Sequence, residues 1–477
     1  MNVPTTSWLS AIIILLDLAI VSVLVPKVIL QRRESGATLA WILAIVFVPY
    51  LGLLSFWIFG TTRIRLRRRK RRRAEQHLQM SLARFRAQQK MSVADEIVAS
   101  SLFTLAGKLG GAGPLPGCEA TLYRDGRQAF DALEQAIDTA GHHIHLVYYL
   151  WEPDHTGARL RDALTRAAGR QVEVRLLLDD VGSRKTKNKF FAPLAAAGGE
   201  ISRFLPVNPL NRQLALNNRN HRKLVVIDGI SGFTGSMNVG DLYAGLAEPW
   251  QDLHVHIQGP VVHELQEVFC QDWYHATARE LASARYFPAI PPAGDICAQF
   301  LASGPADERW LAIHTLLFAA INLARERVWI ETPYFVPDSA VAMALQTAAL
   351  RGIDVRLLLP GYSDHLLVLL AGRSFYKELL AAGVRIFEMD KIIPHAKTAV
   401  IDKIFATTGS ANMDQRSFRL NFEANLFFFG NEIASELERD FLLLFREAHE
   451  VTAADRANLT RSQRLTEGFA RILAPLL

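Results

Sequence analysis

Two long apolar runs lie near the amino end of this 477-residue chain. The run 38–60 contains no charged residue, and as a helix rising about 1.5 Å per residue it would extend roughly 30 Å, the thickness of the hydrocarbon core of a bilayer. The run 8–26 has Asp17 as its one charged residue, and Pro49 in the later run is compatible with a membrane helix. The pattern predicts two transmembrane helices within residues 1–62.

Farther along the chain, short apolar runs alternate with stretches of helical composition. The strings VEVRLLLDD at 172–180 and IDVRLLLPG at 353–361 have the apolar centres expected of strands covered on both faces. Each follows an earlier apolar run and a helix-like stretch, and the order strand, helix, strand indicates a parallel βαβ unit. The fold class is therefore predicted to be α/β, with a similar unit in each of two halves.

Clusters of glycine and proline mark the expected domain boundaries, at 110–117 and 286–295. We expect the two halves to form a duplicated α/β sandwich and to face each other across a pseudo-two-fold axis. The expected organisation is two N-terminal transmembrane helices in 1–62, a basic juxtamembrane helix and linker in 63–117, a first half in 118–285, a second half in 286–455, and an amphipathic C-terminal tail in 456–477.

A strongly basic segment follows the second apolar run. Nine of the eleven residues in 63–73 are Lys or Arg, and none is acidic. Because positive charge beside a membrane helix marks the cytoplasmic side, we expect a multi-pass protein of the inner membrane whose catalytic part is cytoplasmic. The segment also suits contact with anionic headgroups. Lys27, Arg32 and Arg33, between the two runs, favour the opposite orientation more weakly.

The formal net charge of +6 comes from this basic segment, because the chain without those nine residues carries −3. A nucleic-acid-binding protein needs a distributed cationic surface, so this balance disfavours nucleic acid as a partner. The chain has three cysteines, Cys118, Cys270 and Cys297, with no metal-ligand spacing. An odd number without a disulfide pattern suits a reducing compartment.

One polar pattern occurs twice, as NHRKLVVIDGISGFTGSMN at 220–238 and PHAKTAVIDKIFATTGSAN at 394–412. Each copy contains His-x-Lys-x4-Asp and reaches Gly-Ser-x-Asn at the same distance from the histidine. If the apolar part is a strand, His221 and Lys223 lie on one face, whereas Asp228 lies on the other face or in the turn. The aspartates are therefore expected to anchor a turn or a backbone donor. The second copy repeats this arrangement with His395, Lys397 and Asp402.

The residues of the two copies suit the chemistry of a phosphate ester. Lysines, asparagines and serines are mainly hydrogen-bond donors, which match an anion with several oxygens, and no carboxylate or Cys/His cluster indicates a metal. One histidine can attack phosphorus, and the other can protonate the departing alcohol and later activate the acceptor. The motif alone does not say which histidine has which role. A single copy would be unremarkable, but two copies predict one shared site without a cofactor.

These motifs identify the chain as a member of the phospholipase D superfamily over roughly residues 120–450. Strings outside the motifs resemble the bacterial cardiolipin synthases: the apolar run 35–60, ETPYFVPD at 331–338, RSFYKELLAAGVRIFEM at 373–389 and RILAPLL at 471–477. The resemblance implies a phosphatidyltransferase that takes a phosphatidyl group from one phosphatidylglycerol, forms a phosphohistidine, releases glycerol, and passes the group to a second phosphatidylglycerol.

The resemblance also implies roles for individual residues. His221 corresponds to the nucleophile and His395 to the general acid and base. Asp252 and Glu423 match positions where a carboxylate orients a motif histidine. The catalytic set implied is His221, Lys223, Asp228, His395, Lys397 and Asp402, and the substrate-binding set is Ser236, Asn238, Ser410 and Asn412.

Four alternatives compete with this interpretation. A hydrolytic phospholipase D would use water as the acceptor on the same intermediate, and another phosphatidyltransferase would use a different lipid partner. The apolar runs favour transfer, because they hold the site where lipid hydroxyls are concentrated. The acidic balance outside 63–73 disfavours a nuclease of the superfamily. Two intact motifs disfavour a non-catalytic membrane scaffold.

Overall fold

The computed structural model describes residues 5–30, 35–59, 97–110, 113–207, 218–247, 250–305 and 311–474. The chain forms two compact units, which are considered separately below. The N-terminal unit comprises Met1–Leu66 with Val207–Asn217, and the catalytic unit comprises Arg67–Pro206 with Asn218–Leu477. The basic run 63–73 lies outside the described residues.

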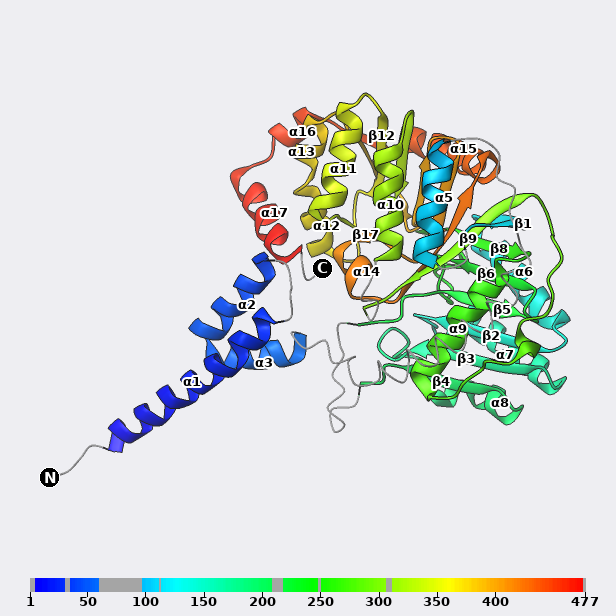
Figure 1. The fold of residues 1–477 in the computed structure, drawn as a ribbon, viewed down its shortest axis with the longest axis horizontal. Helices are drawn as coiled ribbons and strands as arrows, with labels where there is room; N and C mark the ends of the chain where they lie inside the picture. Colours follow the sequence, from blue (N-terminus) through cyan, green and yellow to red (C-terminus); the bar gives the residue numbers. More distant parts are fainter. Residues whose placement is uncertain are drawn as a thin grey trace. The chain divides into compact units, whose positions relative to one another are not determined.

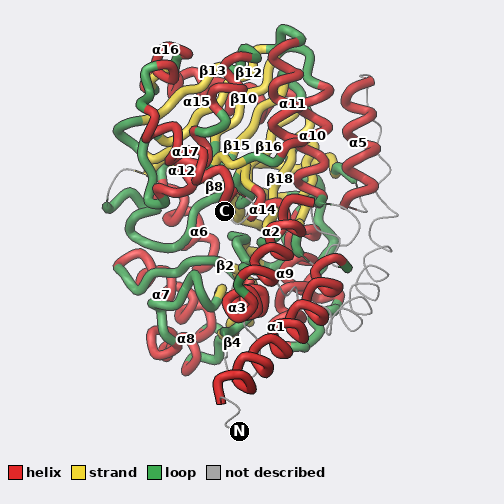
Figure 2. The backbone as a smooth tube through the Cα atoms, turned by 90° about the vertical axis from the view of Figure 1, so that its left-hand side faces the viewer, coloured by secondary structure: helices red, strands yellow, loops and turns green. Residues whose placement is uncertain are grey.

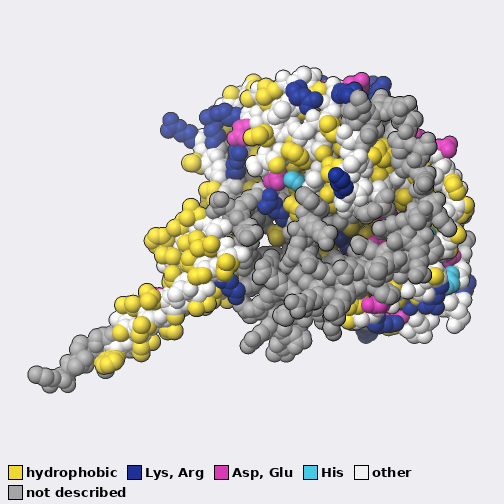
Figure 3. All heavy atoms as spheres, in the orientation of Figure 1, with side chains coloured by type: hydrophobic (Ala, Val, Ile, Leu, Met, Phe, Trp, Pro, Cys, Tyr) yellow, Lys and Arg dark blue, Asp and Glu magenta, His cyan; other side chains and the backbone are white. Residues whose placement is uncertain are grey.

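The N-terminal unit contains three apolar helices, α1 (Thr5–Ile29), α2 (Ser35–Phe47) and α3 (Pro49–Phe59). Within α1, residues Ser10–Ile29 are long and apolar enough to cross a membrane, and this is the one such helix among the described residues. Most of the described side chains of α1 are exposed and hydrophobic (Figure 3). The run 8–26 therefore forms a helix of membrane-spanning length, in agreement with the sequence.

The prediction of a second transmembrane helix in 38–60 is not confirmed, because the described residues of this run form two short helices rather than one straight span. The break falls at Pro49, which has no N–H to donate and disfavours the helical conformation of Val48 before it. The two helices pack on each other, and the rings of Trp41 and Phe56 lie 5.4 Å apart edge to face. Gly52 permits the bend, because a side chain there would lie 2.6 Å from the carbonyl oxygen of Ala44.

The catalytic unit is built on one sheet of fifteen strands with helices on its faces (Figure 1, Figure 2). From one edge to the other, the strands are β19 (His449–Val451), β13 (Arg385–Met389), β12 (Asp354–Pro360), β10 (Arg327–Glu331), β15 (Thr398–Ile401), β16 (Phe405–Gly409), β18 (Glu423–Phe429), β9 (Ile296–Ser303), β1 (Leu115–Tyr123), β8 (His254–Gln258), β6 (Ser231–Gly235), β5 (Leu224–Ile227), β2 (His143–Tyr148), β3 (Glu173–Asp179) and β4 (Glu200–Phe204).

Four short strands form two separate pairs, β11 (Phe335–Val336) with β17 (Met413–Asp414) and β14 (Ile393–Pro394) with β7 (Trp250–Gln251). The helices of this unit are α5 (Ile97–Gly110), α6 (Gly126–Thr139), α7 (His155–Gly169), α8 (Ala192–Ala196), α9 (Val262–Thr277), α10 (Ala312–Leu323), α11 (Ser339–Leu350), α12 (Leu366–Arg373), α13 (Tyr376–Ala381), α14 (Gln415–Arg419), α15 (Asn431–Glu447), α16 (Ala453–Ala457) and α17 (Arg461–Leu473).

Each half contains the predicted parallel unit. Strands β2 and β3 are parallel neighbours joined through α7, and β10 and β12 are parallel neighbours joined through α11. The apolar strings that predicted these strands are almost wholly buried, as expected where helices cover both faces of a sheet. The mixed α/β fold is thus confirmed.

The two halves meet edge to edge at β1 and β9, which pair antiparallel at the centre of the sheet. Counted outward from this junction, the first half runs β1-β8-β6-β5-β2-β3-β4 and the second runs β9-β18-β16-β15-β10-β12-β13, with β19 as an additional edge strand. The motif strands β5 and β15 hold the same place in the two series. One sheet therefore carries both motifs.

Helix α5 occupies the predicted juxtamembrane linker, and here the structure corrects the sequence. Its Leu102 and Ala106 are buried in the core of the second half, and the ring of Phe103 lies 4.7 Å from that of Phe429. The amide of Gln299 donates to the carbonyl of Ala106 over 3.1 Å. The apolar face of α5 finds its partner in the globular part, so the catalytic unit begins before the glycine-rich boundary.

Candidate functional site

Each motif histidine is held at the start of its strand by the backbone of the other half. The N–H of His221 donates to the carbonyl of Phe422 over 2.9 Å, and the N–H of His395 donates to the carbonyl of Gln251 over 2.7 Å. The short pairing of β14 with β7 brings the second contact about. Strand pairing between the halves thus places both histidines at their junction.

Nδ1 of His221 lies 3.0 Å from Oε2 of Glu423 and 3.1 Å from the carbonyl oxygen of Ser410. Both partners are acceptors, so Nδ1 carries the proton and the lone pair of Nε2 is left for chemistry. Glu423 is fully buried. This carboxylate therefore fixes the tautomer and the orientation of the imidazole.

Nδ1 of His395 lies 2.6 Å from Oδ2 of Asp252, which is also buried. The tautomer is the same as at His221, with the proton on Nδ1 and the lone pair on Nε2. The ammonium of Lys397 lies 3.1 Å from this Nε2. Both motifs thus present an imidazole of the same protonation pattern.

The carboxylates are exchanged between the halves. Asp252 belongs to the first half and holds the histidine of the second, whereas Glu423 belongs to the second half and holds the histidine of the first. The sequence indicated that these two acids orient motif histidines but did not pair them. Neither motif histidine therefore takes its carboxylate from its own half.

Burial and the lysines keep both imidazoles neutral. Burial lowers the pKa of His221, and burial together with Lys397 lowers the pKa of His395 to about 4. Burial alone would raise the pKa of Asp252, but the charge and hydrogen bond of His395 lower it to about 2. At neutral pH the site therefore holds ionised carboxylates and uncharged imidazoles, which suits attack by Nε2.

The two motif lysines are buried beside the histidines. Nζ of Lys223 donates to the carbonyl of His221 over 2.7 Å, and Nζ of Lys397 donates to that of His395 over 2.5 Å. Burial lowers the pKa of Lys223 well below its usual value and that of Lys397 to about 8. Each lysine lies on the same side of its strand as the histidine, as alternation predicted.

The motif serines contact the carboxylates. The hydroxyl of Ser236 donates to Oδ1 of Asp252, and the hydroxyl of Ser410 donates to Oε2 of Glu423 over 2.5 Å. Both serines are buried. Each hydroxyl holds the acid that holds a histidine, and direct binding of substrate by the serines stays a prediction.

The motif asparagines differ from each other. Asn238 accepts from the N–H of Leu150 over 3.3 Å and donates to the hydroxyl of Tyr243 over 2.9 Å. The side-chain oxygen of Asn412 is buried without a hydrogen-bond partner among the described residues. The side chain of Asn238 is thus bonded into the wall of the site, whereas the side-chain oxygen of Asn412 can still accept a hydrogen bond.

The motif aspartates lie in turns at the far ends of β5 and β15, away from the imidazoles. Asp228 and Asp402 adopt left-handed backbone conformations with φ of 55° and 53°. Asp228 accepts from the N–H groups of Gly141, His142 and His143 over 2.7–2.9 Å. Asp402 likewise accepts from three consecutive N–H groups, those of residues 325–327. These contacts are those of turn anchors, so the direct catalytic role that the motif suggested is not seen in their geometry.

Aromatic side chains form part of the wall around both histidines, and the sequence did not single them out. The ring of Tyr149 lies 4.9 Å from that of His221 and 5.5 Å from Nζ of Lys223. The rings of Trp250 and Tyr243 lie 4.5 Å and 5.8 Å from that of His395. No periodicity marks these residues. All three belong to the first half, where Tyr149 directly follows β2 and Trp250 begins β7.

Arg222, between the histidine and lysine of the first motif, is a second unpredicted contributor. Its buried guanidinium pairs with Asp272 at 2.6 Å and donates to the carbonyls of Glu423 and Ser303 over 3.1 Å and 3.0 Å. It therefore ties the first motif to the carboxylate strand of the second half.

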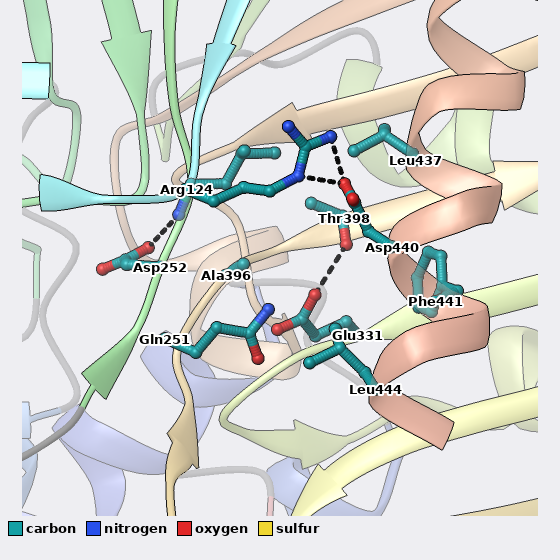
Figure 4. A pocket seen from close by; sticks show the side chains of 11 residues that line it. Arg124, Gln251, Asp252, Glu331, Ala396, Thr398, Leu437, Asp440, Phe441 and Leu444 are labelled. Atoms are coloured by element: carbon teal, nitrogen blue, oxygen red, sulfur yellow. Dashed lines mark hydrogen bonds and ion pairs between the residues drawn. The ribbon is translucent and has the colours of Figure 1, made fainter. Parts of the chain in front are cut away.

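A small cavity of about 10 Å³ lies next to Asp252, with room for about one water molecule (Figure 4). Glu331 borders it and accepts from the hydroxyl of Thr398 over 3.1 Å. Burial raises the pKa of Glu331 to about 8. Arg124, paired with Asp440, forms another side of the cavity. In the part of the chain that is described, no group of three or more His, Cys, Asp or Glu side chains could hold a metal ion.

Comparisons with known proteins agree with this arrangement. Residues 133–273 and 317–444 match the family described as cardiolipin synthase, PLD-like domain. A protein of Geobacillus thermodenitrificans (strain NG80-2) named cardiolipin synthase is 38% identical over 456 residues, which cover 94% of this chain and 90% of the relative. The chain belongs to the cardiolipin synthase family. Residues 11–60 also match the family described as phospholipase D-nuclease N-terminal.

Further relatives in the family are similar over nearly their whole length. Cardiolipin synthase of Listeria monocytogenes serotype 4a (strain HCC23) is 35% identical over 99% of both chains. Among solved structures, phosphatidylserine synthase of Haemophilus influenzae Rd KW20 superposes with a TM-score of 0.61 and 13% identity, covering 78% of this chain and 99% of that one. At that identity the likeness shows a shared fold. The family and the apolar N-terminal helix together indicate phospholipid substrates in a membrane setting.

Proposed function

We propose that this protein is a cardiolipin synthase that uses phosphatidylglycerol as both donor and acceptor through a phosphohistidine intermediate. The observation that carries the proposal is the pair of imidazoles, each with Nδ1 bonded to a carboxylate of the other half. Two imidazoles with a lone pair on Nε2 and two buried lysines suit successive attacks on a single phosphorus atom.

In the first step, Nε2 of His221 attacks the phosphorus of one phosphatidylglycerol. A nitrogen–phosphorus bond forms, the bond from phosphorus to the oxygen of the terminal glycerol breaks, and that oxygen takes a proton from Nε2 of His395. Glycerol leaves. Glu423 stabilises the positive charge on the attacking imidazole through its bond to Nδ1.

In the second step, a terminal hydroxyl of another phosphatidylglycerol gives its proton to Nε2 of His395 and attacks the phosphorus. The nitrogen–phosphorus bond breaks, His221 returns to its neutral form, and cardiolipin is released. The second step restores the proton that His395 lost in the first, so the cycle needs no net acid or base.

The charge of the substrate supplies what the first step needs. His395 must be protonated at Nε2 when glycerol leaves, yet burial and Lys397 hold its pKa at about 4. A phosphodiester anion between the imidazoles favours their charged forms and raises that pKa. Lys397, whose pKa is about 8, lies 3.1 Å from the same nitrogen and is placed to pass a proton to it.

The two lysines neutralise charge on the non-bridging oxygens of the phosphate in the transition state. Asn412 lies in the second motif two residues after Ser410, and its side-chain amide carries two N–H donors. We assign its amide to the phosphate as well. Asn238 completes the matching position in the first half, with Tyr243 holding its orientation.

We further propose that the two halves are related by a pseudo-two-fold axis through the site, which the equivalent strand orders support. The basic run 63–73 favours a catalytic unit on the cytoplasmic side of the membrane. Lipid rather than nucleic acid is the proposed substrate, because the chain outside that run carries a net negative charge.

The test is an assay of the full-length protein with phosphatidylglycerol vesicles in buffer with a chelator. The expected products are cardiolipin and glycerol in equal amounts, and His221→Ala and His395→Ala should each abolish turnover. Phosphatidic acid as the main product would favour the second candidate, a hydrolytic phospholipase D acting on the same intermediate. Cleavage of DNA by the purified protein, or full activity of either variant, would contradict the proposal.

A further inference from the structure

The last helix of the catalytic unit, α17, turns its apolar stripe outward. Leu465, Phe469 and Ile472 follow one another at helical spacing and are 75%, 63% and 73% exposed. On the opposite side of the helix, Ala470 and Glu467 are buried. A surface helix of a soluble domain normally buries its apolar side, so this orientation is the reverse of what packing alone would give.

Polar contacts fix α17 in this orientation. Buried Glu467 pairs with Arg456, and Arg471 forms two hydrogen bonds to Glu378 over 2.9 Å and 3.1 Å. Both pairs join α17 to other parts of the second half. The outward stripe is therefore held by contacts on the inner side of the helix, and is not the result of a loose terminus.

Neighbouring residues extend the stripe into a larger surface. Helix α17 packs along α12, which begins with Leu366 and Leu367, 65% and 38% exposed, after the half-exposed Tyr362. We call these side chains the apolar ridge: Tyr362, Leu366, Leu367, Leu465, Phe469 and Ile472. Figure 3 shows hydrophobic and basic side chains next to each other over this part of the unit.

The exposed charge at the start of α17 is positive. Helix α17 carries Arg461, Arg464 and Arg471 against the single acid Glu467, which is buried and paired. Arg461 and Arg464 are exposed on the first turns of the helix. An amphipathic helix with an outward apolar stripe and exposed arginines fits the boundary between headgroups and acyl chains of an anionic bilayer.

The ridge starts beside the site. Asp364 and His365 precede α12, and the hydroxyl of Tyr334 donates to Asp364 over 3.0 Å while its ring lies 5.6 Å from that of His365. Tyr334 is close enough to Tyr243 for the two to interact electrostatically, and Tyr243 contacts the ring of His395. The start of the ridge thus lies within electrostatic range of Tyr243, which borders the second motif.

We propose that the apolar ridge inserts into the interface of an anionic bilayer and brings phospholipid headgroups to the His395 side of the pocket. The identity of the lipid substrate rests on the proposed function. The ridge would let the catalytic unit take its substrates from the bilayer surface, independently of the N-terminal helices that anchor the chain.

The first test compares two physical forms of the substrate with full-length protein. In the variant L465S/F469S/I472S, activity on phosphatidylglycerol in bilayers should fall at least tenfold, while activity on monomeric dihexanoyl phosphatidylglycerol stays within about twofold. Leu443→Ser on α15, 58% exposed, is the matched control and should change neither rate. Equal loss on both substrates, or no loss on bilayers, would overturn the proposal. Failure of the unmodified protein on both substrates would instead contradict the proposed function.

The second test locates the ridge directly. Phe469→Cys is labelled with an environment-sensitive fluorophore, and the unmodified protein, whose Cys118 and Cys270 are buried, serves as the labelling control. With vesicles containing phosphatidylglycerol, we expect a blue shift and quenching by brominated acyl chains. A blue shift that needs no lipid and grows with protein concentration would assign the ridge to a second copy of the chain and overturn the proposal. A spectrum that vesicles leave unchanged would also overturn it.

Discussion

Replacing Asp252 with Asn removes one negative charge from the site and leaves the size of the side chain almost unchanged. Asp252 belongs to the same half as His221 but contacts Nδ1 of His395 at 2.6 Å. The exchange of carboxylates therefore predicts that Asp252→Asn impairs the steps that His395 performs. In the same way, Glu423→Gln should impair the steps of His221.

The magnitude follows from the electrostatics of the pair. The pKa of Asp252 is lowered from 3.8 to about 2 although burial alone would raise it. A shift of nearly two pH units corresponds to about 2–3 kcal/mol of interaction with the surrounding positive charges and donors. If this interaction energy is lost in the transition state, the reaction slows about 10²-fold. If the amide of Asn at position 252 also favours the wrong tautomer of His395, the reduction in rate approaches roughly 10⁴-fold.

Pre-steady-state kinetics with two donors can assign each carboxylate to its histidine. Phosphatidyl-p-nitrophenol has a leaving group that needs no proton, so the burst of nitrophenol requires the nucleophile alone. His395→Ala and Asp252→Asn should both keep the burst and lose turnover with phosphatidylglycerol. His221→Ala should lose the burst, and Glu423→Gln should slow it about 10²-fold, since it removes a comparable charge.

The reasoning is refuted if the variants pair within each half instead. That result would be Asp252→Asn behaving like His221→Ala, and Glu423→Gln behaving like His395→Ala. Ser236→Ala is a useful graded control, because it removes a donor to Asp252 but leaves the charge in place. We expect its loss to be smaller than that of Asp252→Asn and to fall on the same step.

Three further predictions concern charge, stability and topology. Because the pKa of Lys397 is about 8, its charge is present below that pH and is lost above it. We therefore expect kcat/KM to fall as the pH rises through 8, and we expect Lys397→Arg to remove this fall. A Lys397→Arg variant that still shows the fall of the unmodified protein would contradict the assignment. Asp228→Ala removes the acceptor of three N–H groups and should lower the free energy of unfolding by about 3 kcal/mol, measured as a lower Tm. Activity per folded molecule should stay within a few-fold of that of the unmodified protein. Loss of activity without loss of stability would instead indicate a direct catalytic role. Because α2 and α3 pack on each other, we expect residues 38–59 not to cross the membrane. A Gly36→Cys variant should then react with an impermeant thiol reagent on the membrane side that carries the catalytic unit. Labelling from the opposite side would show that residues 38–59 cross the membrane.

Local patterns predicted the parts of the fold that depend on neighbours in the sequence. The apolar strings gave the parallel strands β3 and β12, because burial on both faces demands an unbroken run. Period-two alternation placed each motif lysine beside its histidine, and the turn after β5 placed Asp228 away from them. The bend at Pro49 was missed because proline is compatible with both a straight and a broken membrane helix, and the packing of α2 on α3 decides between them.

The pairing of acids with histidines could not be predicted, because it depends on contacts between distant segments. Glu423 is 202 residues from His221, and Asp252 is 143 residues from His395. Either pairing is compatible with the motif spacing. The backbone bonds from His221 to Phe422 and from His395 to Gln251, which no local pattern indicates, select the exchanged arrangement. The contacts of the serines were unpredictable for the same reason, since their partners follow from where the carboxylates lie.

The outward stripe of α17 was visible in the sequence as amphipathic character, but the direction of its apolar side was not. The buried Glu467 and its pair with Arg456 decide that direction. A sequence pattern gives the two faces of a helix, whereas a tertiary contact is needed to say which face is inside.

The central claim is that one histidine from each half acts on the same phosphorus atom, and a structure of the protein with orthovanadate tests it most directly. We predict vanadium bonded to Nε2 of His221, with Nε2 of His395 within about 3 Å of the opposite apical oxygen. Vanadate bound by one histidine while the other imidazole lies out of hydrogen-bonding reach would contradict the claim.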